Sequence, residues 1–126
     1  MKKVILILLM VLLCACGKKE DEIKKEISKV NKITCSEVND LVSEGAIVVD
    51  VRTPGEYEED HIENAINIDS NEIKYVVKGK IKDYETKIIV YCRSGNRSAE
   101  SAKILVNLGY KNVYDMGSIT TCYGEE

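Results

Sequence analysis

The pattern of apolar and polar residues from Lys32 onward predicts a succession of short strands and helices. Two continuous apolar runs, at 46–51 and 87–91, have the length of strands that are buried on both faces. An amphipathic helical pattern follows the second run, from about Ser98 to Gly109. This alternation is typical of an α/β domain with a mainly parallel central sheet flanked by helices.

Local signals place the remaining elements. Thr34 and Glu37 fit a capping box that opens a helix ending at Gly45. Thr53 is expected to cap a second, short helix with Pro54 at its first position. The remaining predicted pieces are a weak strand at 65–68, a helix near 70–77, a connector at 78–87 and a last strand at 112–114.

The N-terminal segment 1–15 has the pattern of a signal peptide. Two lysines precede the apolar run 4–13, which is too short to cross a bilayer as a helix, since about 20 apolar residues are needed. The Leu-Cys-Ala-Cys segment 13–16 resembles the lipobox of bacterial lipoproteins, which implies that Cys16 is lipidated. We therefore expect an extracytoplasmic protein that is lipid-anchored to the bacterial cell membrane, with cleavage as a soluble secreted protein as the alternative.

Behind this signal we expect a charged tether at 16–31 and a single domain at 32–126. Removal of the signal lowers the formal net charge from −3 to about −5, which gives no electrostatic support for nucleic-acid binding. The remaining cysteines, Cys35, Cys92 and Cys122, would meet an oxidising compartment. Their odd number leaves at least one free thiol, and Cys92 is the candidate.

The loop at 92–98 contains the candidate chemistry, because it joins the second long strand to the last helix. Unpaired amide groups at the start of that helix can face Cys92, together with the charges of Arg93 and Arg97. Such surroundings stabilise a thiolate, so we expect Cys92 to be anionic near neutral pH. The chain has fifteen lysines and three arginines, so two arginine forks in this loop indicate a role in binding an anion.

The other polar residues of the motif regions are interpreted as structural. Arg52, the third arginine, is expected to hold a loop through Glu56 or another carboxylate, and Asp50 either fixes the active loop or caps the next turn. His61 is expected to make a structural hydrogen bond. One histidine and scattered cysteines lack the spacing of metal ligands, so neither a metal nor a cofactor is expected. The acidic residues Glu56, Glu58, Glu59 and Asp60 are interpreted as a solvated face.

Three segments, at 49–57, 61–68 and 92–98, together resemble the single-domain rhodaneses, a family of sulfurtransferases. The resemblance implies a three-layer α/β fold and a catalytic Cys92 that cycles between thiolate and persulfide. It implies thiosulfate or another small anionic sulfur donor as substrate, cyanide or a thiol as acceptor, and we expect a monomer. It also implies that Arg93 and Arg97 orient the anionic donor and that a backbone cradle binds it, formed by Arg93, Ser94, Gly95, Asn96, Arg97 and Ser98.

Three other functions remain open at this point. The loop is similar to the phosphate loops of cysteine phosphatases and arsenate reductases, but four residues separate Cys92 from Arg97 where those enzymes have five. A thiol redox role would need Cys122 or Cys35 to resolve an oxidised Cys92, although Cys35 is interpreted as a small buried apolar group. A sulfur-carrier or binding module is the third. The chain also departs from the family where Cys122 replaces an expected tryptophan, so an aromatic wall is missing.

Overall fold

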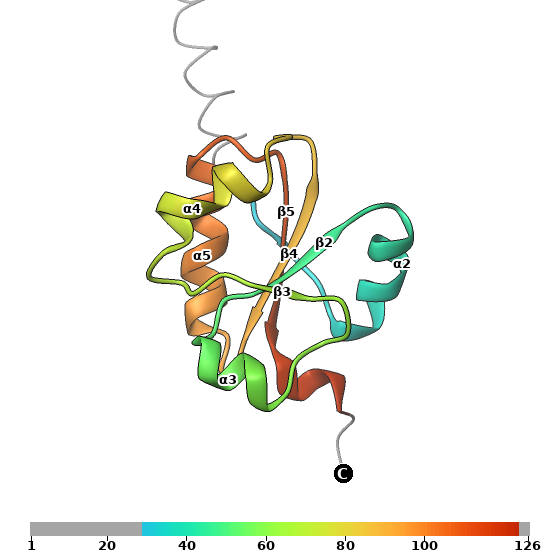
Figure 1. The fold of residues 1–126 in the computed structure, drawn as a ribbon. Helices are drawn as coiled ribbons and strands as arrows, with labels where there is room; N and C mark the ends of the chain where they lie inside the picture. The colour runs from blue at the N-terminus through green and yellow to red at the C-terminus, as the bar shows by residue number, and fades with distance from the viewer. Residues whose placement is uncertain (1–28, 124–126) are drawn as a thin grey trace, which may run out of the picture.

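The structure is a computed structural model that describes residues 29–123 (Figure 1). Its centre is a five-stranded parallel sheet with the order β1-β5-β4-β2-β3. The α/β class and the mainly parallel sheet are therefore confirmed. The strands are β1 (Asn31–Lys32), β2 (Ile47–Asp50), β3 (Ile66–Asn67), β4 (Lys87–Cys92) and β5 (Asn112–Ser118).

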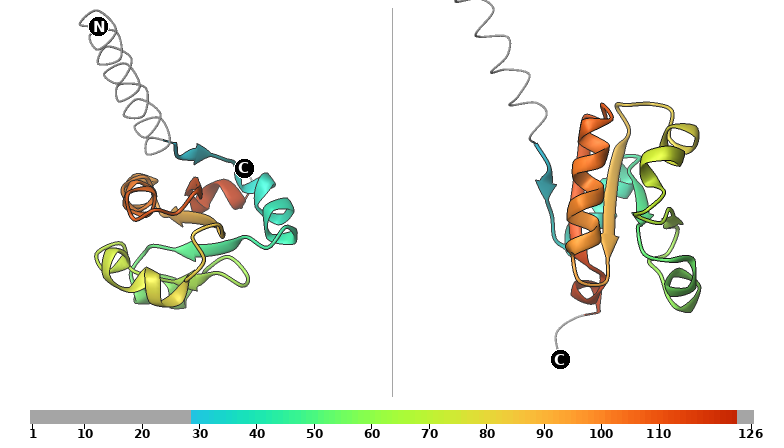
Figure 2. Two further views of the ribbon diagram at one scale, coloured as in Figure 1. Left: turned by 90° about the horizontal axis from the view of Figure 1, so that it is seen from above. Right: turned by 90° about the vertical axis from the view of Figure 1, so that its left-hand side faces the viewer.

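Helices flank the sheet, with α4 and α5 on one side and α2 on the other (Figures 1 and 2). The expected capping box at Thr34 is present, and the Thr53 hydroxyl accepts a hydrogen bond from the backbone N–H of Glu56 at 3.3 Å. Both helix starts are thus formed by the predicted residues. The helical elements are η1 (Cys35–Glu37), α2 (Val38–Ser43), α3 (Pro54–Glu59), α4 (Ile73–Lys80), α5 (Asn96–Asn107) and η2 (Ile119–Cys122).

The largest difference from the expected elements is β1. Asn31, assigned above to the tether, pairs with Tyr114 of β5, and Val30 packs against the core. Two polar residues have no strand signature, so only the partner strand reveals this element. β5 is also longer than predicted, because Asp115 interrupts its apolar pattern; this buried carboxylate binds Lys32 at 2.6 Å.

Helix boundaries shift by a few residues. α5 begins at Asn96 rather than Ser98, and α4 extends through Gly79, which the sequence places in a connector. The signal peptide, most of the tether and Cys16 lie outside the described residues. Between residues 29 and 123, no helix is both long and apolar enough to cross a membrane.

Two apolar cores cover the two faces of the sheet. On one face, α4 and α5 pack against residues of β2 and β4, and the side chain of Cys92 belongs to this core. On the other face, Val38 of α2 and Ile119 of η2 pack with Tyr91 and Met116. Cys92 therefore lies at the boundary between a packed core and the end of the sheet.

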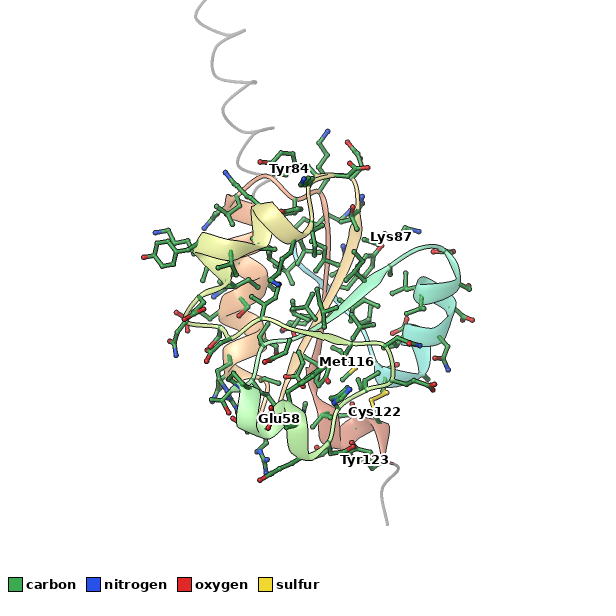
Figure 3. All side chains as sticks on the ribbon, viewed as in Figure 1. Glu58, Tyr84, Lys87, Met116, Cys122 and Tyr123 are labelled. Carbon is green, nitrogen blue, oxygen red and sulfur yellow. A yellow bond between two sulfur atoms is a disulfide. The ribbon has the colours of Figure 1, made fainter. Side chains whose placement is uncertain are left out.

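A disulfide between Cys35 and Cys122 joins η1 to η2, with a Cα–Cα distance of 5.2 Å across 87 residues of sequence (Figure 3). The interpretation of Cys35 as a small buried apolar group is therefore wrong. The cause is topological, since η1 follows β1 and η2 follows β5. Parallel neighbouring strands bring the turns after their carboxyl ends to one edge of the sheet. Without β1, the sequence offers no reason to place these cysteines together.

Removing this disulfide should destabilise the domain by about 2 to 5 kcal/mol, because the crosslink closes a long loop in the unfolded chain. The double variant Cys35→Ala, Cys122→Ala should show this loss in urea unfolding followed by circular dichroism. Reductant should weaken the wild-type protein by a similar amount and leave the variant unchanged. Equal stability of the wild type with and without reductant would contradict a disulfide that supports the fold.

Candidate active site

Cys92 ends β4 and faces the start of α5. The backbone N–H of Gly95 donates a hydrogen bond to the Cys92 sulfur at 3.0 Å, and that of Ser98 donates at 3.4 Å. Gly95 has a φ of +98°, a conformation that side-chain-bearing residues adopt at a cost, and it turns its amide toward the sulfur. Cys92 is the free cysteine among residues 29–123, as expected, and its side chain is fully buried.

The end of β5 supports this loop from behind. A bulge after Val90 moves the pairing by one residue, so that Tyr91 lies opposite Gly117. A side chain at Gly95 would touch the Cα of Gly117 at 3.8 Å, and the Ser118 hydroxyl donates to the carbonyl of Arg93. The sequence alone assigned Ser118 no role. Its hydroxyl here fastens the first peptide of the loop.

Arg93 and Arg97 both bind Glu56 of α3, which lies at the same end of the sheet as the carboxyl end of β4 (Figure 1). Arg97 donates to both carboxylate oxygens, at 2.8 and 3.1 Å, and Arg93 Nε donates to Oε2 at 3.3 Å. The Glu56 side chain is 22% exposed, whereas those of Arg97 and Arg93 are 32% and 60% exposed. Glu56 was expected on a solvated acidic face; it is instead partly buried and paired with two arginines.

Glu56 and Arg97 shift each other's pKa values. Hydrogen bonds from Arg97, with a smaller contribution from Arg93, lower the pKa of Glu56 to about 2, although partial burial acts in the opposite direction. The pKa of Arg97 is raised, mainly by its hydrogen bonds to Glu56 and in smaller part by the charge of Cys92. Arg97 thus lies within electrostatic reach of both the carboxylate and the sulfur.

The other predicted cradle residues divide into two groups. The Ser98 hydroxyl donates to the carbonyl of Gly95 at 3.0 Å, which closes the turn beneath the sulfur. Ser94 and Asn96 are exposed, and the structure gives their side chains no specific contact with Cys92. The site therefore brings together the Cys92 sulfur, two backbone amides and the two arginine side chains that bind Glu56.

Arg52 is structural, as expected, but its partner is Asp50. The Arg52 guanidinium donates to both Asp50 oxygens, and its backbone N–H donates to Asp50 Oδ1 at 2.9 Å. Both side chains are buried, and the Arg52 guanidinium also donates to the carbonyl of Asp60. The chain before and after α3 is thereby fixed to the end of β2.

His61 also has the structural role that was expected for it. Its Nδ1 bonds the carbonyl of Tyr57 at 2.7 Å, and its ring stacks on the Tyr57 ring with centroids 3.8 Å apart. The Tyr57 hydroxyl donates to the carbonyl of Ala65 at 2.6 Å. These contacts position α3, and with it Glu56. The described part of the chain contains no group of three or more His, Cys, Asp or Glu residues placed to hold a metal ion.

The disulfide bears on the redox alternative. Cys35 and Cys122 are bonded to each other, so in this state neither is available to resolve an oxidised Cys92. The redox interpretation therefore loses its second thiol.

The chain belongs to the rhodanese-like domain family, whose model matches residues 34–120. It is 34% identical to thiosulfate sulfurtransferase PspE of Escherichia coli K12 over 71 residues, which cover 56% of this chain and 68% of the relative. It is 32% identical over 90 residues to thiosulfate sulfurtransferase GlpE of Pseudomonas entomophila, with 71% and 81% covered. A solved structure described as rhodanese with anions from E. coli is similar with a TM-score of 0.58 at 32% identity, over 60% of this chain and 89% of that one.

The ion pairs of Glu56 with Arg93 and Arg97 predict a pH-dependent contribution to the stability of the fold. Since the pKa of Glu56 falls from its ordinary 4.5 to about 2 on folding, its contribution is complete above pH 4.5 and is lost as the pH falls toward 2. We expect about 1 to 2 kcal/mol, because solvent screens the half-exposed arginines. Urea unfolding at about pH 6 and about pH 2 should show a larger loss for the wild type than for Glu56→Gln. Equal losses would contradict the bridge.

Proposed function

We propose that this protein is a sulfurtransferase that moves a sulfane sulfur atom from a small donor such as thiosulfate, through a Cys92 persulfide, to cyanide or a thiol. The observation that carries the proposal is the Cys92 sulfur, which accepts two amide hydrogen bonds at the start of α5. Amide donors placed in this way stabilise negative charge that develops on a sulfur atom during its reaction. The relatives named thiosulfate sulfurtransferase support the same reaction class.

In the first half of the reaction, the Cys92 thiolate attacks the outer sulfur of thiosulfate. A sulfur–sulfur bond forms to Cys92 while the bond inside thiosulfate breaks, and sulfite leaves with the electron pair of that bond. The persulfide then carries the negative charge on its outer sulfur. The N–H groups of Gly95 and Ser98 donate to the inner sulfur, that of Cys92, and α5 adds its positive N-terminal dipole.

In the second half, a nucleophilic acceptor attacks the outer sulfur of the persulfide. With cyanide, a carbon–sulfur bond forms, the sulfur–sulfur bond breaks, and thiocyanate leaves. Cys92 is returned as the thiolate, again beside the amides of the loop. No net oxidant or reductant is consumed, since each half transfers a neutral sulfur atom.

The full-length protein should therefore form thiocyanate from thiosulfate and cyanide, and Cys92→Ser should abolish the reaction because it removes the nucleophile. Colorimetry with ferric ion measures the product, and mass spectrometry should find one additional sulfur atom on the Cys92 peptide after thiosulfate alone. Ser94→Ala, in the same loop, should retain sulfur uptake. Release of phosphate from aryl phosphates without sulfur uptake would favour the phosphatase alternative instead.

We also propose that the protein acts at the outer face of the bacterial cell membrane, anchored through a lipid on Cys16. The lipobox-like segment 13–16 carries this proposal. The Cys35–Cys122 disulfide supports it, because disulfides persist in oxidising compartments.

The anchor predicts that full-length protein expressed in bacteria sediments with membranes, and that its N-terminal peptide begins at a lipid-modified Cys16. The Cys16→Ala variant should lose the lipid, which mass spectrometry detects. Cys14→Ala is the matched control and should keep it, since only the residue after the cleavage site is modified. An unmodified N-terminus in the wild type would rule the anchor out.

A further inference from the structure

The Glu56 carboxylate binds the two guanidinium groups that a negatively charged sulfur donor would need. Its carboxylate takes both donors of the Arg97 fork and the Nε of Arg93. A second contact, from the Thr53 hydroxyl to Oε1 at 3.2 Å, holds the carboxylate in this position. The guanidinium groups of the loop therefore already bind an anion, and that anion is part of the protein.

The charges of the site consequently balance. Arg93 and Arg97 contribute two positive charges, which Glu56 and a thiolate at Cys92 cancel. The nearby Arg52 adds no net charge, because Asp50 neutralises it. Thiosulfate carries two negative charges and would enter a site without net attraction, in competition with Glu56 for the same fork.

We propose, on the basis of the sulfurtransferase function above, that Glu56 is a specificity-determining residue that disfavours doubly charged donors. The preferred donor class is then a sulfane sulfur compound with one negative charge or none, such as the persulfide of a small thiol. With such a donor, the Cys92 thiolate attacks the outer sulfur, the donor's sulfur–sulfur bond breaks, and the donor's thiolate leaves. The proton stays on the transferred sulfur, so the step balances without another reagent.

Two donors that differ mainly by one charge test this inference. Thiosulfate is a dianion and methanethiosulfonate a monoanion, and both deliver a sulfane sulfur. In Glu56→Gln, kcat/KM for thiosulfate relative to methanethiosulfonate should rise about three- to tenfold, the effect of one charge at roughly 6 Å with an effective dielectric constant of about 40 to 80. Thiocyanate formation at saturating cyanide measures both rates.

Matched variants separate charge from structure. Glu58→Gln removes an exposed carboxylate from the same helix and should leave the ratio unchanged (Figure 3). Glu56→Asp keeps the charge and should stay near the wild-type ratio. If Glu56→Gln slows both donors equally, its role is only to hold the loop, and the inference is overturned.

A second measurement does not depend on sulfur transfer. Iodoacetate and iodoacetamide alkylate the same thiolate with loss of iodide and differ by one charge. Mass spectrometry of the Cys92 peptide should show a higher ratio of iodoacetate to iodoacetamide rates in Glu56→Gln than in the wild type. If the wild type takes no sulfur from any donor, the proposed function fails, and this alkylation ratio alone decides whether Glu56 selects by charge.

Discussion

The hydrogen bonds from the loop amides to the Cys92 sulfur are the constraint on which the rest of the site depends. They require a backbone turn that brings the N–H groups of Gly95 and Ser98 to one atom, and this turn needs a positive φ at Gly95. Such a turn is stable only with support, which the end of β5 supplies through Gly117 and Ser118. The hydrogen bonds to the Cys92 sulfur therefore depend on the register between β4 and β5.

The disulfide extends this support to the C-terminal end of the domain. η2 directly follows Ser118, and Cys122 ties it to η1 beyond β1. The family resemblance predicts a tryptophan near this position, and Cys122 stands there instead. A covalent link between two turns now restrains the segment where an aromatic side chain was expected. This substitution is effective where thiols are oxidised, which is the environment that the N-terminal segment predicts.

Local signals in the sequence predicted most of the fold and part of the site. Helix caps at Thr34 and Thr53, the two buried strands and the turn before α5 depend on neighbouring residues, so they could be recognised from the pattern. Pairings between distant segments could not. The bond between Cys35 and Cys122 and the bridge from Glu56 to Arg97 join segments 87 and 41 residues apart. A carboxylate that binds a distant guanidinium has the same sequence signature as a solvated one.

The ion pairs of Glu56 with Arg93 and Arg97 stabilise the loop, but they also lower its affinity for an anionic donor. Two arginines placed four residues apart repel each other, and without a counter-anion from the protein they would attract one from solution. Glu56 removes this repulsion and fixes the guanidinium groups in place. However, the guanidinium edge of Arg97 that binds Glu56 can bind one carboxylate or the oxygens of a donor in bidentate fashion, not both at once. Any donor that needs the fork must displace Glu56, whereas a donor recognised only by the amides leaves the bridge intact.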